Sequence, residues 1–360
     1  MSILIFVVIL VVLIVGHEFG HFIAAKFARM PVIEFGVGFP PRLWGKKIGE
    51  TLYSLNALPF GGFVRIYGED DAKDEGDPTR FSNRSRLSQA IVVAAGPMAN
   101  LVLAYAFIAV ALMFGVPQIV DEEHTLSDAR VIVTSVLPES PAERAGFKAG
   151  DVVTSVLNEG TLVPIEATED LMEVFANASS LLTVNLTRGE EMMSVDVVPE
   201  AGIVKDDVER KAIGIASARI GTVQYSFFDA VVKAVPDTLA QVEAVFLGLI
   251  SLIGGAFTLS ADIENIAGPV GIAGLVGEAS LYGVGSLLML SAVISVNLAV
   301  INLLPFPALD GGRLAMLGVE AVSRRRIPAS VSHAINYVGF MLLIALMVAV
   351  TVQDISRLAT

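Results

Sequence analysis

The stretch Gly16-His17-Glu18-Phe19-Gly20-His21 follows an uncharged apolar run that covers residues 1–15. Positions i and i+4 of an α-helix lie on one face, so this spacing lets His17 and His21 bind one metal ion. Glu18 would lie beside that metal, where a carboxylate can take a proton from water. The stretch therefore predicts a metal-dependent hydrolase, and zinc is the first choice of metal because two imidazoles suit it.

The apolar run and the motif together predict a membrane helix over residues 2–25, with Lys26 and Arg29 just beyond it. At a rise of 1.5 Å per residue, His17 would lie roughly 22 Å along this helix, inside a hydrocarbon core of about 30 Å. Ionisable residues at such a depth are costly and by default indicate function. A signal peptide is the competing interpretation, but the run lacks a preceding basic segment and a small-residue cleavage site, so we expect it to be retained.

The composition is typical of a membrane protein, since 54% of the 360 residues are hydrophobic and only 17% are charged. The chain has no cysteine, which excludes disulfides, thiolate zinc sites and cysteine nucleophiles. A net charge of −13 argues against nucleic acid as a partner. Residues 117–285 hold 25 acidic and 9 basic residues, a net charge of −16, so the acidity is concentrated there.

Three later apolar stretches complete a set of four predicted transmembrane helices. They cover residues 89–116, 283–304 and 334–352. Basic residues gather between Arg29 and Arg86, and the positive-inside rule therefore places that segment in the cytosol and the N-terminus outside. The predicted membrane domain consists of residues 1–116 and 283–360.

A further apolar stretch, residues 238–259, lies in an expected linker at 201–282 that also contains a turn at 268–273. Counting it as a span would place Asp310 and the basic run at 324–326 outside, against the positive-inside rule. We therefore expect an amphipathic helix at the membrane interface. A re-entrant helix remains the alternative.

Residues 31–68, between the first two spans, predict a membrane-associated β segment. They alternate apolar and polar residues with glycine breaks, a pattern that indicates short strands and hairpins. Their apolarity suggests a sheet that dips into the membrane edge, which is possible where protein covers it or water reaches it.

Residues 127–200 predict an α/β domain inserted outside the membrane. Strands are expected near 129–136, 151–157, 182–187 and 193–198. The helix and glycine turn between the first two read Glu139-Ser-Pro-Ala-Glu-Arg-Ala-Gly-Phe-Lys-Ala-Gly-Asp151, which resembles the PDZ domains of bacterial proteases. Such a sheet edge can bind a C-terminal peptide by strand addition. A steric spacer without a ligand is equally compatible with the pattern.

A third metal ligand is expected after the third span. That span breaks at Pro305 and Pro307, and Asp310 follows, before a basic loop at 313–326. The rise of the preceding helix brings Asp310 to the same depth as His17 and His21. Iron or cobalt could bind to the same three ligands, so the choice of zinc depends on ligand type alone.

Three separated stretches together resemble one family. They are the motif at residues 17–21, the run Asn302-x-x-Pro-x-Pro-x-Leu-Asp-Gly-Gly312, and the PDZ-like domain. The chain resembles the bacterial site-2 proteases, the intramembrane zinc metalloproteases typified by the regulator of sigma-E protease. The resemblance implies that His17, His21 and Asp310 bind Zn²⁺ and that Glu18 activates water.

The resemblance also implies a set of substrate-binding residues. They are Asn302, Asn297, Gly36, Gly38 and Phe63. The first two belong to the helix before Asp310, and the others to the membrane-dipping β segment. The type member has two PDZ domains and this chain has room for one, so it would be a single-PDZ variant.

The function implied is cleavage of the transmembrane segments of single-span proteins, such as anti-sigma factors and remnant signal peptides. The protein would lie in a bacterial cytoplasmic (inner) membrane, with its active site near the cytosolic side. A non-catalytic membrane adaptor that binds protein C-termini is the main alternative, although a scaffold needs neither metal ligands nor a base. A transporter is less compatible, because the ionisable residues gather at one depth and no repeat is visible.

Overall fold

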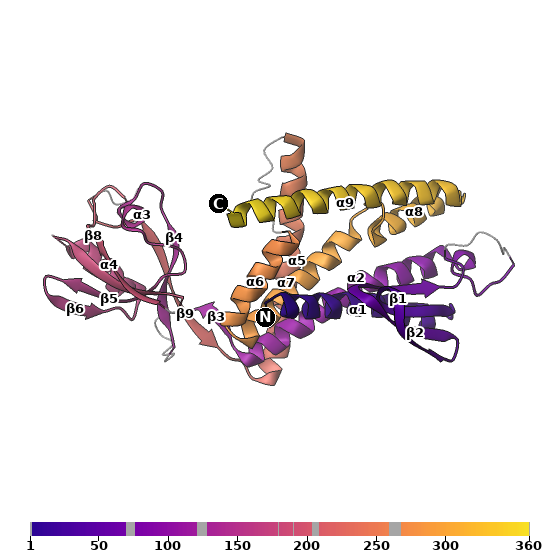
Figure 1. The fold of residues 1–360 in the computed structure, drawn as a ribbon, viewed down its shortest axis with the longest axis horizontal. Helices are drawn as coiled ribbons and strands as arrows, with labels where there is room; N and C mark the ends of the chain where they lie inside the picture. The colour runs from indigo at the N-terminus through magenta and orange to yellow at the C-terminus, as the bar shows by residue number, and fades with distance from the viewer. Residues whose placement is uncertain are drawn as a thin grey trace. The chain divides into compact units, whose positions relative to one another are not determined.

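The computed structural model describes residues 2–69, 76–120, 128–178, 180–189, 191–203, 209–258 and 268–359. The chain divides into two compact units (Figure 1). We call the first, Met1–Phe114 with Tyr225–Thr360, the membrane unit, and the second, Gly115–Gln224, the inserted unit. Residue 127 and two parts of the expected linker, 204–208 and 259–267, lie outside the described residues.

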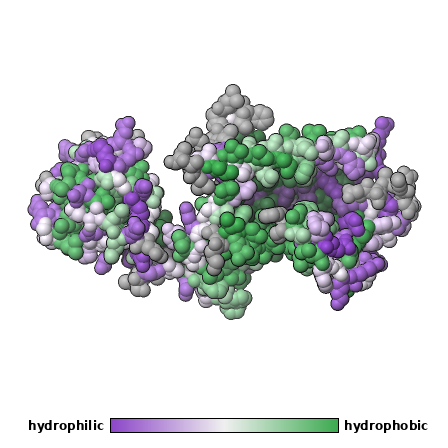
Figure 2. Space-filling model, in the orientation of Figure 1, coloured by the Kyte–Doolittle hydropathy of each residue, from purple (hydrophilic) through white to green (hydrophobic). Residues whose placement is uncertain are grey.

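Five helices in the described part of the chain are long and apolar enough to cross a membrane. They are α1 (Ser2–Phe27), α2 (Arg86–Phe114), α5 (Phe227–Thr258), α7 (Val284–Leu303) and α9 (Ala329–Ala359). Four of them coincide with the predicted spans. The fifth, α5, contains the stretch expected at the interface. In the space-filling view, hydrophobic residues cover much of the membrane unit, whereas the inserted unit mixes hydrophobic and hydrophilic residues (Figure 2).

Two further helices correct the sequence prediction. The turn expected at 268–273 is the start of α6 (Pro269–Leu281), and the loop expected at 313–326 is largely α8 (Asp310–Ser323). The carboxylate of Asp354, on α9, accepts hydrogen bonds from the backbone N–H groups of Gly268 and Gly271 at 3.1 and 2.8 Å. The cap of α6 therefore comes from a residue distant in sequence, which local patterns do not reveal.

The glycine pair at the start of α8 looks like a loop in the sequence but serves close packing. A Cβ added at Gly311 would lie 2.0 Å from the carbonyl oxygen of Leu304, and one at Gly312 would lie 2.2 Å from that of Phe306. The first turn of α8 is thus pressed against the backbone of the chain that leads into it. Only glycine permits this approach.

The β segment forms a small antiparallel sheet from β1 (Val32–Ile48) and β2 (Thr51–Ile66). Both strands bend, so that residues 32–37 pair with 62–66 on one side and with 51–55 on the other. Residues 44–48 pair with the outer side of 51–55. The sheet therefore has four short passes, as the glycine breaks predicted, and 62–66 forms one of its edges.

A buried carboxylate holds this sheet together. Glu34 is only 4% exposed. It accepts hydrogen bonds from Arg42 and Ser54 at 2.8 Å each and forms an ion pair with Arg65 at 3.3 Å. Because buried charges are stable only when paired and hydrogen-bonded, these three partners explain how a charge is kept inside the segment.

The inserted unit is built on a seven-stranded sheet. Its strands are β3 (Val116–Ile119), β4 (Arg130–Val136), β5 (Val152–Asn158), β6 (Thr161–Pro164), β7 (Leu182–Arg188), β8 (Glu191–Val197) and β9 (Ile215–Val223). They follow the order β3-β9-β4-β5-β7-β8, with β6 paired to β5. Two helices, α3 (Pro141–Ala145) and α4 (Thr168–Asn177), accompany the sheet. The four expected strands are β4, β5, β7 and β8, and the unit extends beyond 127–200 to include β3 and β9.

The helix and glycine turn of the PDZ-like motif have the cap residues that its sequence predicts. Ser140 caps α3 by accepting a hydrogen bond from the Glu143 N–H at 3.3 Å, and Pro141 occupies the first turn. Gly146 ends the helix with φ at 89°, a left-handed conformation that favours glycine. The turn then delivers Asp151, which is fully buried.

Asp151 connects this turn to β7. Its carboxylate accepts hydrogen bonds from Arg188 at 2.7 and 2.8 Å and from the Lys148 N–H at 2.8 Å. Burial raises the pKa of Asp151, but the Arg188 and Lys148 hydrogen bonds outweigh it and hold the pKa below its usual value. The carboxylate therefore contributes stability that is complete above about pH 4 and is lost as pH falls through its lowered pKa.

Replacing Asp151 with Asn should destabilise the inserted unit by on the order of 2 kcal/mol at neutral pH, because a charged hydrogen-bond acceptor is lost. Hydrogen exchange of the full-length protein should show faster exchange in β5 and β7, and the difference from wild type should shrink as pH falls below about 4. Asp196→Asn is the control, since Asp196 accepts from Thr183 at the surface. Equal exchange in wild type and Asp151→Asn at pH 7 would contradict the prediction.

Candidate metal centre

Three side chains from two distant helices meet in the membrane unit. His17 Nε2 and His21 Nε2 on α1 lie 3.2 Å apart, and Asp310 Oδ2 on α8 lies 3.1 Å from the first and 3.3 Å from the second. Together they form the one group within the described residues that could hold a metal ion. The Asp310 Oδ2 atom is buried, and apart from these two ion-pair contacts it has no hydrogen-bond partner among the described residues.

The spacing of these three atoms fits zinc. Zinc in proteins is tetrahedral, with bonds of about 2.0–2.2 Å to nitrogen and oxygen, which places neighbouring ligand atoms about 3.3–3.6 Å apart. The separations of 3.1, 3.2 and 3.3 Å between the three atoms are close to this range. A buried carboxylate oxygen that faces two imidazole nitrogens is stabilised when a cation lies between them, because a buried charge needs a partner. The residues present therefore fit a zinc ion with one coordination position left open.

Asp310 is held in place from several sides. Ala308, two residues before it, has φ at 71°, and its backbone N–H donates to the side chain of Asn336 on α9 at 3.3 Å. One turn along α8, Arg313 forms an ion pair with Glu69 and stacks over the ring of Phe81, 4.5 Å from its centroid. These contacts fix the start of α8, and so the position of the Asp310 carboxylate.

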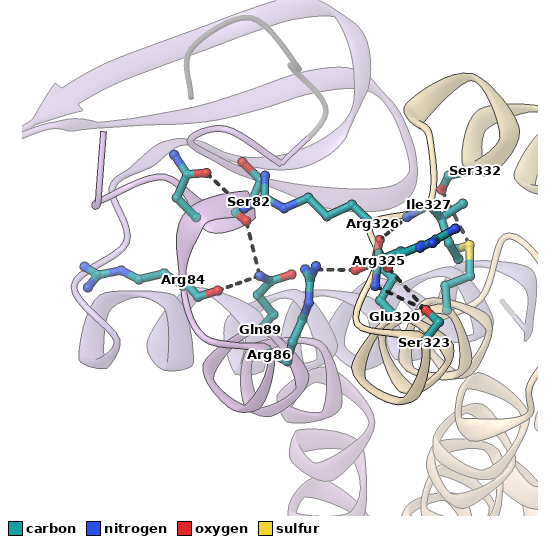
Figure 3. A network of polar contacts seen from close by, with 12 residues as sticks. Ser82, Arg84, Arg86, Gln89, Glu320, Ser323, Arg325, Arg326, Ile327 and Ser332 are labelled. Atoms are coloured by element: carbon teal, nitrogen blue, oxygen red, sulfur yellow. Dashed lines mark hydrogen bonds and ion pairs between the residues drawn. The ribbon is translucent and has the colours of Figure 1, made fainter. Parts of the chain in front are cut away.

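The far end of α8 is anchored by a polar network on the start of α2 (Figure 3). Arg86 of α2 forms an ion pair with Glu320 at 2.8 Å, and Glu320 also accepts from the Ile327 N–H at 2.7 Å. Gln89, one turn further along α2, donates to the backbone oxygen of Arg84 at 2.8 Å. Both ends of α8 are therefore attached to segments that also surround α1.

Helix α2 supports both histidines from behind. His21 Nδ1 lies 2.8 Å from the carbonyl oxygen of Val92, and His17 Nδ1 lies 3.4 Å from the side-chain nitrogen of Asn100. A zinc-bound histidine usually has such an outer partner, which orients the ring. Between the two contacts lies Gly96, where an added Cβ would lie 2.3 Å from His21 Nε2 and 2.9 Å from His17 Cε1. The backbone of α2 thus fits directly against the two rings.

A cleft of about 440 Å³ opens in front of the three ligands. Glu18 lines it, and so do Phe63 and Val64 of β2 and Asn302 of α7. Glu18 lies against the sheet edge, because a Cβ added at Gly62 would be 3.2 Å from Glu18 Cγ. The cleft therefore brings together a candidate metal site, the carboxylate of Glu18 and a strand edge. A second cavity of about 330 Å³ shares Glu69 and Arg313 with it.

The structure brings some of the expected site residues together and leaves others apart. Asn302 and Phe63 line the cleft with the three ligands and Glu18. Asn297 instead donates to the carbonyl oxygen of Val293 in its own helix, at 2.9 Å. Gly36 packs against Phe63, and Gly38 has φ at 77°, so both shape the sheet. Neither of them lines the cleft.

Two residues of α2, Gly96 and Asn100, are not among the predicted site residues. The structure places both against the histidines. The available signal was an amide soon after Gly-Pro within an apolar span, at the membrane depth of the histidine motif. That signal does not specify which neighbouring helix the residues face.

Comparison with known proteins agrees with this geometry. The model of peptidase family M50 matches residues 5–346. The chain belongs to peptidase family M50. Consistent with this, a protein of Clostridium perfringens is 35% identical over 95% of both chains. The membrane metalloprotease ARASP, chloroplastic, of Arabidopsis thaliana is 34% identical over 98% of this chain and 78% of its own.

One further relative supports the M50 assignment, and one solved structure resembles part of the chain only weakly. The zinc metalloprotease RasP of Oceanobacillus iheyensis is 29% identical over 98% of both chains. A solved PDZ domain, from the SdrC-like protein of Listeria monocytogenes, aligns with 24% of this chain and 86% of its own at 21% identity. Its TM-score of 0.21 is too low to support a shared fold. The M50 match and these relatives make this multi-pass membrane protein a zinc metalloprotease.

Proposed function

We propose that this M50 protease cleaves peptide bonds within the membrane-spanning segments of single-span proteins, using His17, His21 and Asp310 as zinc ligands and Glu18 as the base. The observation that carries the proposal is the location of the metal site. Two of its ligands lie in the last part of α1, a helix long and apolar enough to span, and the third begins α8. A site at that depth acts on substrates that are themselves in the membrane.

The proposed topology places the metal near the cytosolic side of a bacterial cytoplasmic membrane. Lys26 lies in the last turn of α1 and three arginines follow α8 at 324–326, and the positive-inside rule assigns these ends to the cytosol. Helix α1 then enters from outside, α2 returns, and the acidic inserted unit lies outside. In the β segment, Leu43, Trp44 and Ile48 are exposed, as expected for a sheet that touches lipid.

Helix α5 is proposed to lie along the outer interface rather than to cross. Its contacts are with the ends of neighbouring helices that lie outside in this topology. Gln241 donates to Met289 near the start of α7. The Tyr225 N–H, just before α5, donates to the carbonyl oxygen of Leu112 near the end of α2. In Figure 1, α5 runs steeply across the direction of α1 and α9. Four spans and one interfacial helix account for these contacts.

The edge of the β sheet is proposed to receive the substrate. In the described part of the chain, residues 62–66 pair with 32–37 alone, so the other edge of this pass has no partner strand. Phe63 and Val64 of this pass line the cleft beside Glu18. An unwound substrate segment would add to this edge by backbone hydrogen bonds, and Asn302 would hold a freed backbone group across the cleft.

His17, His21 and Asp310 would hold the zinc ion, which would supply Lewis-acid chemistry that polarises a carbonyl and lowers the pKa of water towards about 7. Glu18 then takes the proton of the attacking water and passes it to the leaving amine. The surrounding protein excludes bulk water and orients the scissile bond, while the strand edge keeps it extended. Each role falls on a residue that lines one cleft.

The proposed substrates are single-span regulators such as anti-sigma factors, together with remnant signal peptides. The inserted unit is proposed either to bind a C-terminal peptide along a sheet edge or to exclude substrates with bulky outer parts. A non-catalytic adaptor is the alternative. The zinc-compatible ligand set with an adjacent carboxylate favours the protease, because an adaptor has no use for either.

The test is cleavage of a purified single-span reporter in detergent. The wild type is expected to hold about one zinc and to cut within the span, and a chelator should stop the reaction until zinc is restored. Asp310→Ala should lose both zinc and activity, whereas Asp237→Ala, on α5 and outside the cleft, should keep both. Cleavage confined to the soluble flanks, or full zinc content in Asp310→Ala, would refute the proposal.

A further inference from the structure

The side chain of Asn100 is oriented in a way that its chemistry does not favour. The residue is fully buried, and its Oδ1 atom has no hydrogen-bond partner among the described residues. Its Nδ2 atom faces His17 Nδ1 at 3.4 Å. An amide nitrogen facing a ring nitrogen, with the amide oxygen left unsatisfied, is costly in a buried site.

The protonation of a metal-binding imidazole determines how the side chains of Asn100 and His17 should be arranged. A neutral imidazole carries one proton, so a ring that binds metal through Nε2 has its N–H at Nδ1. His17 directs Nε2 towards Asp310 and His21, and its Nδ1–H therefore needs an acceptor. The amide oxygen of Asn100 is such an acceptor, whereas the amide nitrogen is a donor. The oxygen and nitrogen of an amide occupy nearly equivalent positions, so a half-turn of the group exchanges them.

We propose that Asn100 is a positioning residue that accepts a hydrogen bond from His17 Nδ1 through Oδ1, and so fixes the tautomer of His17 that binds zinc. This inference rests on the ligand set proposed above. His21 has the equivalent arrangement, because its Nδ1 lies 2.8 Å from the carbonyl oxygen of Val92. One helix, α2, then supplies the acceptor for both histidines, one from its backbone and one from a side chain.

The position of Asn100 is itself fixed by neighbouring contacts. Ser295 of α7 donates to the backbone oxygen of Asn100 at 2.7 Å, which connects α2 to α7 at this level. Both Asn100 and Ser295 are fully buried. The amide therefore has little freedom except rotation about its own bond, and that rotation decides whether His17 meets an acceptor or a donor.

The experiment compares zinc affinity in Asn100→Leu, Asn100→Asp and the control Ser291→Ala, by competition with a chelator in the full-length protein. Asn100→Leu keeps the size of the side chain and removes the acceptor, and should bind zinc about 10–100-fold more weakly. Asn100→Asp keeps an acceptor and should remain within a few-fold of wild type. Ser291→Ala removes another buried hydroxyl of α7, which donates to Leu287 in its own helix, and should bind zinc as the wild type does.

A second measurement does not depend on the folding of any variant. The chain has 4 histidines, so ¹⁵N NMR of histidine-labelled zinc protein can report the tautomer of His17. A proton on Nδ1 is expected. The proposal would be overturned by an unprotonated Nδ1 in His17 or by wild-type zinc affinity in Asn100→Leu. An equal loss of zinc affinity in Asn100→Leu and Asn100→Asp would also overturn it. Asp310→Ala in the same titration separates the two hypotheses, since unchanged zinc binding there would refute the ligand set itself.

Discussion

Replacing Glu18 with Gln should lower the rate of cleavage by about 10²–10⁴-fold and leave zinc content unchanged, because a general base typically contributes that factor. Glutamine has the shape of glutamate but cannot take a proton from water. Glu18 lines the cleft and does not belong to the group of three possible ligands. The loss should therefore appear in the rate alone, while metal binding and folding stay as they are.

The measurement is the initial rate of reporter cleavage with the zinc content of the same sample. Glu243→Gln is the matched control, because Glu243 lies exposed on α5 and should be dispensable. A Glu18→Gln protein that holds zinc and cuts at the wild-type rate would contradict the proposed mechanism. One that loses zinc would show that Glu18 contributes to the metal site itself.

Replacing Gly96 with Ala should weaken zinc binding and cleavage together, each by about 10²-fold. The new methyl group would overlap His21 Nε2, at 2.3 Å from the Cβ position, and crowd His17 Cε1 at 2.9 Å. Either the rings turn away from Asp310 or α2 moves back, and a displacement of about 1 Å at a catalytic group can cost 10²-fold. Alanine is otherwise a better helix former than glycine, so the helix itself should not suffer.

Zinc affinity and cleavage should both be measured, since Gly96→Ala should change both and Glu18→Gln only the second. Gly248→Ala is the control, because a Cβ at that helical position would meet nothing within 4 Å. It should be neutral or slightly stabilising. Wild-type zinc affinity in Gly96→Ala would mean that α1 and α2 are less closely packed than the structure has them.

The grouping of the three candidate ligands was largely predictable because their residues obey local rules. His17 and His21 are one helical turn apart, so sequence spacing alone brings them together. Asp310 follows a span of known rise, so its depth could be calculated although its distance from His17 could not. Gly96 and Asn100 were visible as unusual residues in α2, but the face that they present depends on helix packing, which no period in the sequence encodes.

The remaining differences arise where partners are distant in sequence. The N-terminus of α6 is capped by Asp354 rather than by a neighbour, and the glycines of α8 are explained by the chain packed against them. In the inserted unit, β9 lies between β3 and β4. A strand that follows the others by many residues cannot be assigned to a sheet from its pattern alone.

The contact between Asp354 and α6 has a consequence for biosynthesis. Domains of a nascent chain generally fold as their residues emerge, from the N-terminus onwards. Helix α6 packs against α1, which carries the histidines, and against α9, but the carboxylate that satisfies its first N–H groups belongs to Asp354, 86 residues after Gly268. The membrane unit can therefore complete its assembly only after α9 has been inserted. A ribosome that stalls before Asp354 would leave an incomplete helix bundle in the membrane, which links the onset of proteolytic activity to the synthesis of α9.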